Sequence, residues 1–186
     1  MQYVNFIKCL EENPVIASTY DDLWEDAIAS PAQVIFYLSA NILSIDERAT
    51  AAHKAGKVLL VHADLAEGIG KDGSGLKYLM KCGVDGIIST KAYLIKLAKE
   101  CGLVAIQRMF LFDSKGIENI TDMVKGTAPH FIEIMPGVIE KEIIRFSKGR
   151  TPVIAGGLVE TKAEVTRALR CGAIAVSTGK SELWAI

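Results

Sequence analysis

The sequence has no long apolar segment, and that absence excludes a membrane-spanning protein. Half of its 186 residues are hydrophobic and the mean hydropathy is +0.27, yet no run approaches the roughly 18 apolar residues of a transmembrane helix. The segment MQYVNFIKCLEENP has no basic leader followed by an apolar run, and it predicts a short helix before the first strand. We therefore expect a cytoplasmic protein without a membrane partner.

Cysteine pairs and excess charge are also absent. Cys82, Cys101 and Cys171 each directly precede a glycine and Cys9 stands alone, so none forms a C-x-x-C pair. Buried, reduced cysteine is favoured over redox or metal chemistry, and we predict no cofactor. The formal net charge is -1 and the pI is about 6.3, so any nucleic-acid binding must come from a local patch.

What the chain does have is a repeat of glycine followed by an apolar run. Each of six glycines is predicted to close a helix, because glycine tolerates the left-handed backbone found there. The six are Gly56, Gly83, Gly102, Gly126, Gly149 and Gly172. Their spacing of roughly 19 to 27 residues fits one strand plus one crossover helix. The pattern predicts serial β/α units around a parallel sheet.

Eight such units can be placed. The strands are predicted at residues 14–18, 34–39, 58–64, 86–90, 104–110, 131–135, 153–155 and 173–178. Asp21 or Asp22, Ser44, and Asp113 or Ser114 are predicted to begin helices, and Thr161 with Glu164 forms a T-x-x-E capping box. Residues 1–186 are thus predicted to be an α/β protein, a small single-domain (β/α)8 TIM-like barrel with short helices. An open doubly wound sheet is the alternative.

Polar side chains interrupt the apolar strands near their carboxyl ends. Strand alternation predicts that four of them face the barrel interior near its mouth, where barrels gather functional groups: His62, Asp64, Gln107 and Glu133. An unpaired buried carboxylate costs several kcal/mol, so Asp64 and Glu133 must meet a cation, a donor or a ligand hydroxyl. A packed layer in which these groups satisfy one another is the alternative.

Glycines and hydroxyls at the last two strands predict a phosphate site. Gly156 and Gly157 follow the seventh strand, and Ser177, Thr178 and Gly179 end the eighth. Barrels often hold phosphate at these two adjacent positions, where backbone N–H groups are approachable. The alternative is that the glycines serve only tight turns.

Two further features are candidates with open alternatives. Arg108 has the opposite strand parity from Gln107 and is expected to face the helices unless the strand end turns. It is kept as a ligand-binding candidate because a guanidinium there needs a carboxylate or phosphate, although an ion pair with a neighbouring unit's acid is equally open. Lys71 and Asp72 lie on the loop AEGIGKDGSG, which is either a lid or a solvated loop.

Several of these segments also carry a family resemblance. The segments VHADLAEGIGKD, DGIISTK, AIQRMFLFDS, FIEIMPG, PVIAGG and STGKSELW resemble the glycerol-3-phosphate-responsive antiterminators, the regulatory proteins of glycerol uptake operons. The match runs in register from about Val58 to Trp184. It implies a barrel that binds glycerol 3-phosphate and then acts on the leader of glycerol-catabolism messenger RNA, preventing early termination. Glu160 stands where a basic residue is expected, and His130 where an acid is expected.

The resemblance and the residues agree on the ligand but not on RNA. The glycine loops could hold the phosphate dianion, while Asp64 and Glu133 accept from the glycerol hydroxyls. No RNA-binding motif is present, so the RNA role rests on the resemblance alone. Three basic clusters are candidates, although most charge runs are solvated helix faces: Lys91, Lys96 and Lys99; Arg145, Lys148 and Arg150; Arg167 and Arg170.

An enzyme remains the alternative class. Asp64, Glu133 and His62 around a phosphate pocket could act on a phosphorylated triose or a glycerophosphodiester, with the carboxylates binding Mg²⁺ or serving as acid and base. Against this, the chain has no long βα insertion to exclude water and no general base with an oriented partner. We therefore favour a regulator without catalytic residues. The sequence leaves a homodimer and a bound metal open.

Overall fold

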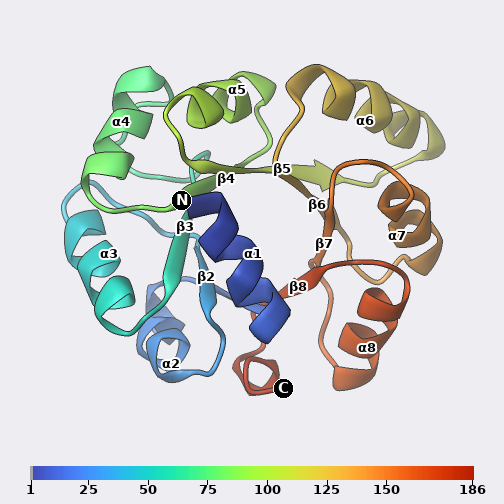
Figure 1. The fold of residues 1–186 in the computed structure, drawn as a ribbon, viewed down its shortest axis with the longest axis horizontal. Helices are drawn as coiled ribbons and strands as arrows, with labels where there is room; N and C mark the ends of the chain where they lie inside the picture. The colour runs from blue at the N-terminus through green and yellow to red at the C-terminus, as the bar shows by residue number, and fades with distance from the viewer. Residues whose placement is uncertain (1) are drawn as a thin grey trace.

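The computed structural model describes residues 2–186 as a closed barrel of eight parallel strands (Figure 1). Each strand pairs with the next in chain order, and β8 pairs with β1. The strands are β1 (Val15–Thr19), β2 (Val34–Tyr37), β3 (Val58–His62), β4 (Gly86–Ser89), β5 (Val104–Phe110), β6 (Phe131–Met135), β7 (Val153–Gly156) and β8 (Ala175–Thr178). This confirms the predicted (β/α)8 barrel, because an open sheet would leave its edge strands unpaired.

Seven helices follow the first seven strands and surround the barrel (Figure 1). They are α2 (Trp24–Ala29), α3 (Ile45–Lys54), α4 (Gly73–Lys81), α5 (Ala92–Glu100), α6 (Ser114–Thr127), α7 (Glu140–Ser147) and α8 (Lys162–Arg170), with short 3-10 turns at Asp21–Leu23 and Ser181–Leu183. None of the helices within residues 2–186 is long and apolar enough to cross a bilayer.

The predicted helix before the first strand is confirmed as α1 (Gln2–Glu12). It lies across one end of the barrel (Figure 1), where Phe6, Cys9 and Leu10 join the apolar cluster that fills the interior. The rings of Phe6 and Phe131 lie 4.9 Å apart. Because Phe131 begins β6, α1 closes the amino-terminal end of the barrel and leaves the carboxyl-terminal end as the mouth.

Strand alternation divides the apolar side chains between two cores. Residues such as Ile16, Phe36 and Ile106 fill the barrel interior, whereas their chain neighbours Ala17, Tyr37 and Ala105 pack between the strands and the helices. Both faces of every strand are therefore covered, as expected of a parallel sheet.

The glycine pattern is confirmed at four of its six positions. Positive φ angles of 72°, 92°, 79° and 102° occur at Gly56, Gly83, Gly102 and Gly172. The prediction is wrong at Gly126, because α6 continues through it to Thr127 and Ala128 takes the left-handed angle, φ 44°. At this end of α6 the Thr127 hydroxyl donates to Gln107 Oε1 of β5 at 2.5 Å. The prediction is also wrong at Gly149, which has no positive φ although α7 ends two residues before it, as the helices before the four confirmed glycines do.

The predicted caps are partly confirmed. Asp113 accepts a hydrogen bond from the Gly116 N–H at the start of α6. Ser44 occupies the N-cap position of α3, but its side chain makes no capping bond. Asp22 accepts only from the N–H of Leu23, while the Asp21 carboxylate turns outward to Tyr37 and Arg48.

Candidate functional site

A cavity of about 440 Å³, lined by charged, hydroxyl and apolar residues, opens at the mouth of the barrel. Its walls are the segments that follow β1, β7 and β8, and its floor includes side chains from β5 and β6. The lining residues are 18–20, 22, 23, 157–160 and 177–180, with Leu38, Arg108, Glu133 and Met135. Six of the ten predicted ligand-binding residues line it: Arg108, Glu133, Gly157, Ser177, Thr178 and Gly179.

A buried ion pair forms the floor of the cavity. Arg108 Nε donates to Glu133 Oε2 at 2.6 Å, and the Ser177 hydroxyl donates to Glu133 Oε1 at 2.6 Å. The side chains of Arg108 and Glu133 are 8% and 1% exposed. A charge this deeply buried requires such partners. Glu133 is therefore held by protein donors on both oxygens.

Gly156 serves this ion pair without lining the cavity itself. A Cβ at position 156 would lie 2.5 Å from both Glu133 Oε1 and Ser177 Oγ. Any side chain there would separate the serine from the carboxylate. Gly156 is thus required for space rather than as a donor beside a ligand.

The predicted facing of two neighbours in β5 is wrong. Gln107 turns outward to Thr127 of α6, and Arg108 faces the barrel interior. The register places Arg108 opposite Glu133, and residues paired in adjacent strands face the same side. Arg108 therefore pairs with the buried Glu133 inside the barrel, whereas Gln107 packs between the strands and the helices. The Gln107 Nε2 has no hydrogen-bond partner among the described residues.

His62 shares the inward face of β3 with Leu60, and Asp64 lies just beyond the end of that strand; neither lines the cavity. Asp64 Oδ1 accepts from the Ser89 hydroxyl at 2.5 Å, and Oδ2 accepts from the N–H and hydroxyl of Thr90 at 2.8 and 2.7 Å. Burial opposes the charged form, yet these hydrogen bonds lower the pKa of Asp64. The carboxylate thus ties the end of β3 to the end of β4.

His62 is nearly buried, at 5% exposure. Burial, followed by the positive charge of Arg108, lowers the pKa of His62 below its usual value. The ring is therefore neutral at pH 7, and its Nδ1 has no hydrogen-bond partner within residues 2–186. A ligand role for His62 or Asp64 stays a prediction.

The loop after β7 presents backbone donors to the cavity. Gly157 and Leu158 are consecutive residues with positive φ, 72° and 58°, and both line the cavity. In the described chain, the N–H groups of Gly157, Leu158, Val159 and Gly179 have no hydrogen-bond acceptor. The Thr178 hydroxyl donates to the Val159 carbonyl at 2.7 Å and joins this loop to the end of β8.

The N-terminus of α8, by contrast, is already occupied. Glu164 Oε2 accepts from the N–H groups of Glu160 and Thr161 at 2.9 and 3.0 Å, and Thr161 Oγ1 accepts from Glu164 N–H at 3.3 Å. The predicted capping box is therefore confirmed. The bond from Glu160 N–H is the largest cause of a lowered pKa at Glu164. Free donors thus lie in the loop at residues 157–159 rather than at the helix end.

Sequence reasoning missed two lining charges, Lys180 and Asp22. Lys180 Nζ lies 3.6 Å from Glu160 Oε1, and both side chains line the cavity between the loops after β7 and β8. The available signal was the lysine directly after the S-T-G segment. Asp22, also in the lining, had been considered only as a helix cap.

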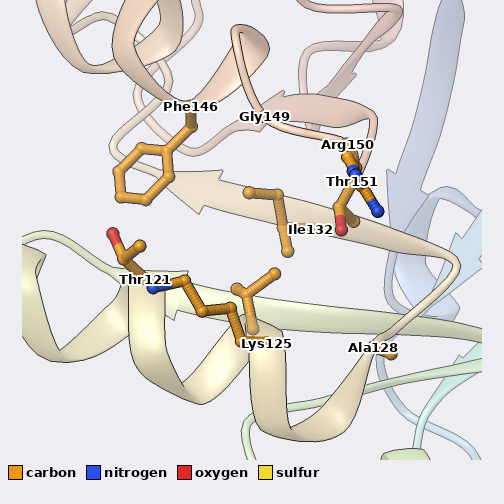
Figure 2. A pocket seen from close by; sticks show the side chains of 9 residues that line it. Thr121, Lys125, Ala128, Ile132, Phe146, Gly149, Arg150 and Thr151 are labelled. Carbon is orange, nitrogen blue, oxygen red and sulfur yellow. The ribbon is translucent and has the colours of Figure 1, made fainter.

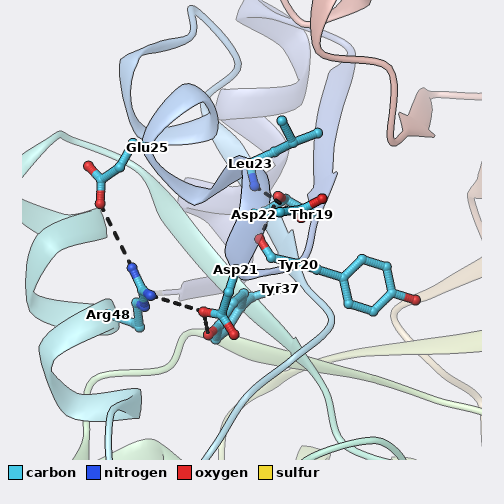
Figure 3. A network of polar contacts seen from close by, with 8 residues as sticks. All are labelled: Thr19, Tyr20, Asp21, Asp22, Leu23, Glu25, Tyr37 and Arg48. Carbon is cyan, nitrogen blue, oxygen red and sulfur yellow. Dashed lines mark hydrogen bonds and ion pairs between the residues drawn. The ribbon is translucent and has the colours of Figure 1, made fainter.

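A network outside the barrel fixes the wall formed after β1 (Figure 3). Asp21 Oδ1 accepts from the Tyr37 hydroxyl at 2.6 Å and from Arg48 Nη2 at 2.9 Å, and the Arg48 guanidinium lies over the Trp24 ring at 4.9 Å. Burial opposes ionisation of Asp21, but the bonds from Tyr37 and Arg48 lower its pKa. This anchors the neighbouring cavity residues Tyr20 and Asp22.

The glycine-rich loop after β3 is held in place. Lys71 donates to the Ala66 carbonyl, and Asp72 Oδ1 accepts from the N–H groups of Ser74 and Gly75, each at 2.9 Å, capping α4. A Cβ on Gly75 would lie 1.8 Å from the Gly70 carbonyl oxygen, so the loop packs closely on the helix. These contacts support an anchored loop rather than a lid.

A second cavity, of about 570 Å³, lies outside the barrel between α6 and α7 (Figure 2). Its lining is mainly apolar, with Val124, Ala128, Ile132 and Phe146, and includes the cations Lys125 and Arg150. Among residues 2–186, no group of three or more His, Cys, Asp or Glu side chains is arranged to hold a metal ion.

Comparison with known proteins identifies the family. The chain is 37% identical over 180 residues to the uncharacterized protein YgcP of Escherichia coli (strain K12), covering 95% of this chain and 94% of that protein. Two crystal structures are also similar. The glycerol uptake operon antiterminator regulatory protein of Listeria monocytogenes has TM-score 0.87 and 31% identity, covering 92% of this chain and 95% of that one. The related Thermotoga maritima protein has TM-score 0.83 and 30% identity, covering 91% and 96%.

More distant structures share only the fold. Aldolases and an epimerase align with TM-scores of 0.67 to 0.71 at 9% to 14% identity. The family profile described as glycerol-3-phosphate responsive antiterminator matches residues 15–184, which cover every strand of the barrel and every lining residue of the mouth cavity. The chain therefore belongs to the glycerol-3-phosphate responsive antiterminator family, a family of regulatory proteins.

Proposed function

We propose that the chain senses glycerol 3-phosphate by binding it in the mouth cavity. The observation that supports this most is the set of four backbone donors, at Gly157, Leu158, Val159 and Gly179, without an acceptor in the described chain. Neutral donors on a preformed loop favour an anion such as a phosphate. The phosphate group is assigned to these donors.

The glycerol end is assigned to the floor of the cavity. Each carboxylate oxygen can accept more than one hydrogen bond, so Glu133 can receive a ligand hydroxyl while keeping Arg108 and Ser177. Arg108 makes one hydrogen bond within residues 2–186, through Nε, which leaves its outer N–H groups for ligand oxygens. A cavity of about 440 Å³ is large enough for a three-carbon phosphate.

The regulatory output is proposed to be messenger-RNA antitermination, on the strength of the family. Several of the predicted basic clusters are partly engaged within the protein. Lys99 donates to the Ala128 carbonyl, Arg145 Nη1 lies 3.7 Å from Glu142, and Arg167 Nε lies 3.3 Å from Glu140. These contacts favour solvated helix faces, so membership of the family alone supports an RNA partner.

No observation favours the enzyme alternative. Glu133 and Asp64, the two acids considered for catalysis or Mg²⁺, each accept protein hydrogen bonds on both oxygens. A catalytic base is normally oriented by a hydrogen-bond partner, and Nδ1 of His62, the third group considered, has no partner among the described residues. We therefore propose a binding role for this mouth.

Thermal unfolding with three ligands tests the sensor. Glycerol 3-phosphate alone spans both ends of the cavity, so it is expected to raise the melting temperature more than glycerol or inorganic phosphate. At 100 times its dissociation constant the gain is about 2.7 kcal/mol. No shift at millimolar glycerol 3-phosphate would contradict the proposal.

Gel-shift measurements test the RNA partner separately. The leader transcript of a glycerol-catabolism gene is expected to bind in the presence of glycerol 3-phosphate and to bind less without it. A scrambled transcript of equal length is the control. If the ligand binds but neither transcript does under any condition, the effector assignment stands and the RNA assignment is wrong.

A further inference from the structure

The ion pair between Glu160 and Lys180 crosses the rim of the mouth cavity. Lys180 Nζ lies 3.6 Å from Glu160 Oε1, and the two side chains are 45% and 61% exposed. Glu160 comes from the loop after β7 and Lys180 from the segment after β8, so the pair spans the two loops that carry the free backbone donors. Both charged groups therefore lie in the region assigned to the phosphate.

The backbones of both residues are anchored, whereas their side chains are not. Glu160 N–H donates to Glu164 at 2.9 Å, and Lys180 N–H donates to Thr178 Oγ1 at 3.1 Å. In the described chain each charged side-chain end has one ion-pair partner, which is the other. Since an exposed pair contributes only about 0 to 1 kcal/mol, the two groups can separate without loss of the fold.

The charges that line the cavity show why the Glu160–Lys180 pair controls the attraction of an anion. Arg108 is matched by Glu133 in a short, buried contact. Lys180 is thus the remaining lining cation, and it is matched by Glu160 while Asp22 adds a further negative charge. A dianion entering the loop region gains the full attraction of Lys180 only when the Glu160 carboxylate moves away.

We infer that Glu160 is a built-in competitor of the phosphate for Lys180. In the free protein the carboxylate neutralises the ammonium group, and the phosphate displaces it on binding. Lys180 supplies the charge that the neutral backbone donors lack, and Glu160 weakens the affinity and so sets the ligand concentration at which the protein responds. This inference rests on the proposed function, because it assigns the regulation of the same site.

Calorimetric titration of glycerol 3-phosphate at low salt tests the competition, because salt screens exposed charges. Glu160→Gln is expected to bind about threefold more tightly, the factor that corresponds to an exposed ion pair. Lys180→Gln is expected to bind about tenfold more weakly, as for loss of a charged hydrogen bond. In the double variant of Glu160→Gln with Lys180→Gln, the gain in affinity from Glu160→Gln is expected to be smaller. Without Lys180 there is no cation for the Glu160 carboxylate and the phosphate to compete for.

Two nearby substitutions provide matched controls. Glu182→Gln and Lys162→Gln remove one exposed charge each, of the same two types, from residues outside the cavity lining. Both are expected to leave the affinity within a factor of about 1.5. If Glu182→Gln and Glu160→Gln raise the affinity equally, the cause is a general effect of net charge and not local competition. That result would overturn the inference.

The remaining outcomes separate the inference from the proposed function. If the unaltered protein binds glycerol 3-phosphate and Glu160→Gln binds it no more tightly, the competition is wrong and the sensor stands. If only Glu160→Gln binds, the competition is supported. If neither protein binds glycerol 3-phosphate or inorganic phosphate, both the inference and the phosphate assignment are overturned.

Discussion

Two cavities of this barrel contrast with each other, because the larger is mainly apolar and the smaller contains charged groups. The groove between α6 and α7 is the larger, at about 570 Å³, and is mainly apolar (Figure 2). The mouth cavity is smaller, at about 440 Å³, but contains a buried ion pair, unpaired backbone donors and two consecutive residues with positive φ. Strained backbone and buried charge mark a functional site better than volume does. The comparison favours the mouth as the binding site.

The sharpest contrast is in buried charge, and Glu133→Gln tests it. The substitution keeps the size of the side chain but leaves the Arg108 guanidinium buried without its counter-charge. Unfolding in urea is expected to show a loss of about 3 to 5 kcal/mol. The double variant Arg108→Met with Glu133→Gln is expected to recover part of this loss. Unchanged stability of the single variant would show that the pair is dispensable.

The second test exchanges one glycine in each cavity. At Gly157 a side chain would meet Met135 Cε at 2.7 Å, and its φ is 72°, so Gly157→Val is expected to abolish the ligand-dependent gain of about 2.7 kcal/mol. The matched control is Gly149→Val in the groove, where the added Cβ meets the Phe146 carbonyl oxygen at 3.0 Å. Thermal unfolding with ligand is expected to show the full gain in this control. Loss of the gain in Gly149→Val alone would move the site to the groove.

A third test uses the titration of His62, which lies inside the barrel. Burial and the positive charge of Arg108 lower the pKa of His62 in the folded protein, so the unfolded chain binds the proton more readily. The free energy of unfolding is therefore expected to decrease as the pH falls through about 6.5. His62→Asn is expected to reduce this slope, measured by urea unfolding between pH 7.5 and 5.5. The remaining slope includes His130, whose pKa burial also lowers.

The smallest effect is expected beside the groove. Gly126 lies inside α6, and a Cβ there would meet no atom within 4 Å. Gly126→Ala is therefore expected to stabilise the protein by about 0.5 to 1 kcal/mol through helix propensity, without changing ligand affinity. A change in affinity would couple α6 to the mouth and weaken the distinction between the two regions.

The sequence predicts most of what depends on periodicity. The eight strands, the capping box at Thr161 and Glu164, and the inward facing of Glu133 follow from local patterns. The facing of Gln107 and Arg108 does not, because either polar residue can be placed inside until the register with β6 is known. The contact of Lys180 with Glu160 joins two loops, and no local pattern specifies a side-chain pair of that kind.

The helix α1 completes the packed interior at the base of the barrel. Because apolar side chains fill the interior and Phe6, Cys9 and Leu10 cover its base, a molecule bound among the strand ends enters and leaves past the loops at residues 19–23, 157–160 and 177–180. Fusion partners or surface tethers attached ahead of α1 stand at the sealed base. Immobilising the protein by that end leaves the rim facing solution, which suits surface-based measurements of both small ligands and RNA.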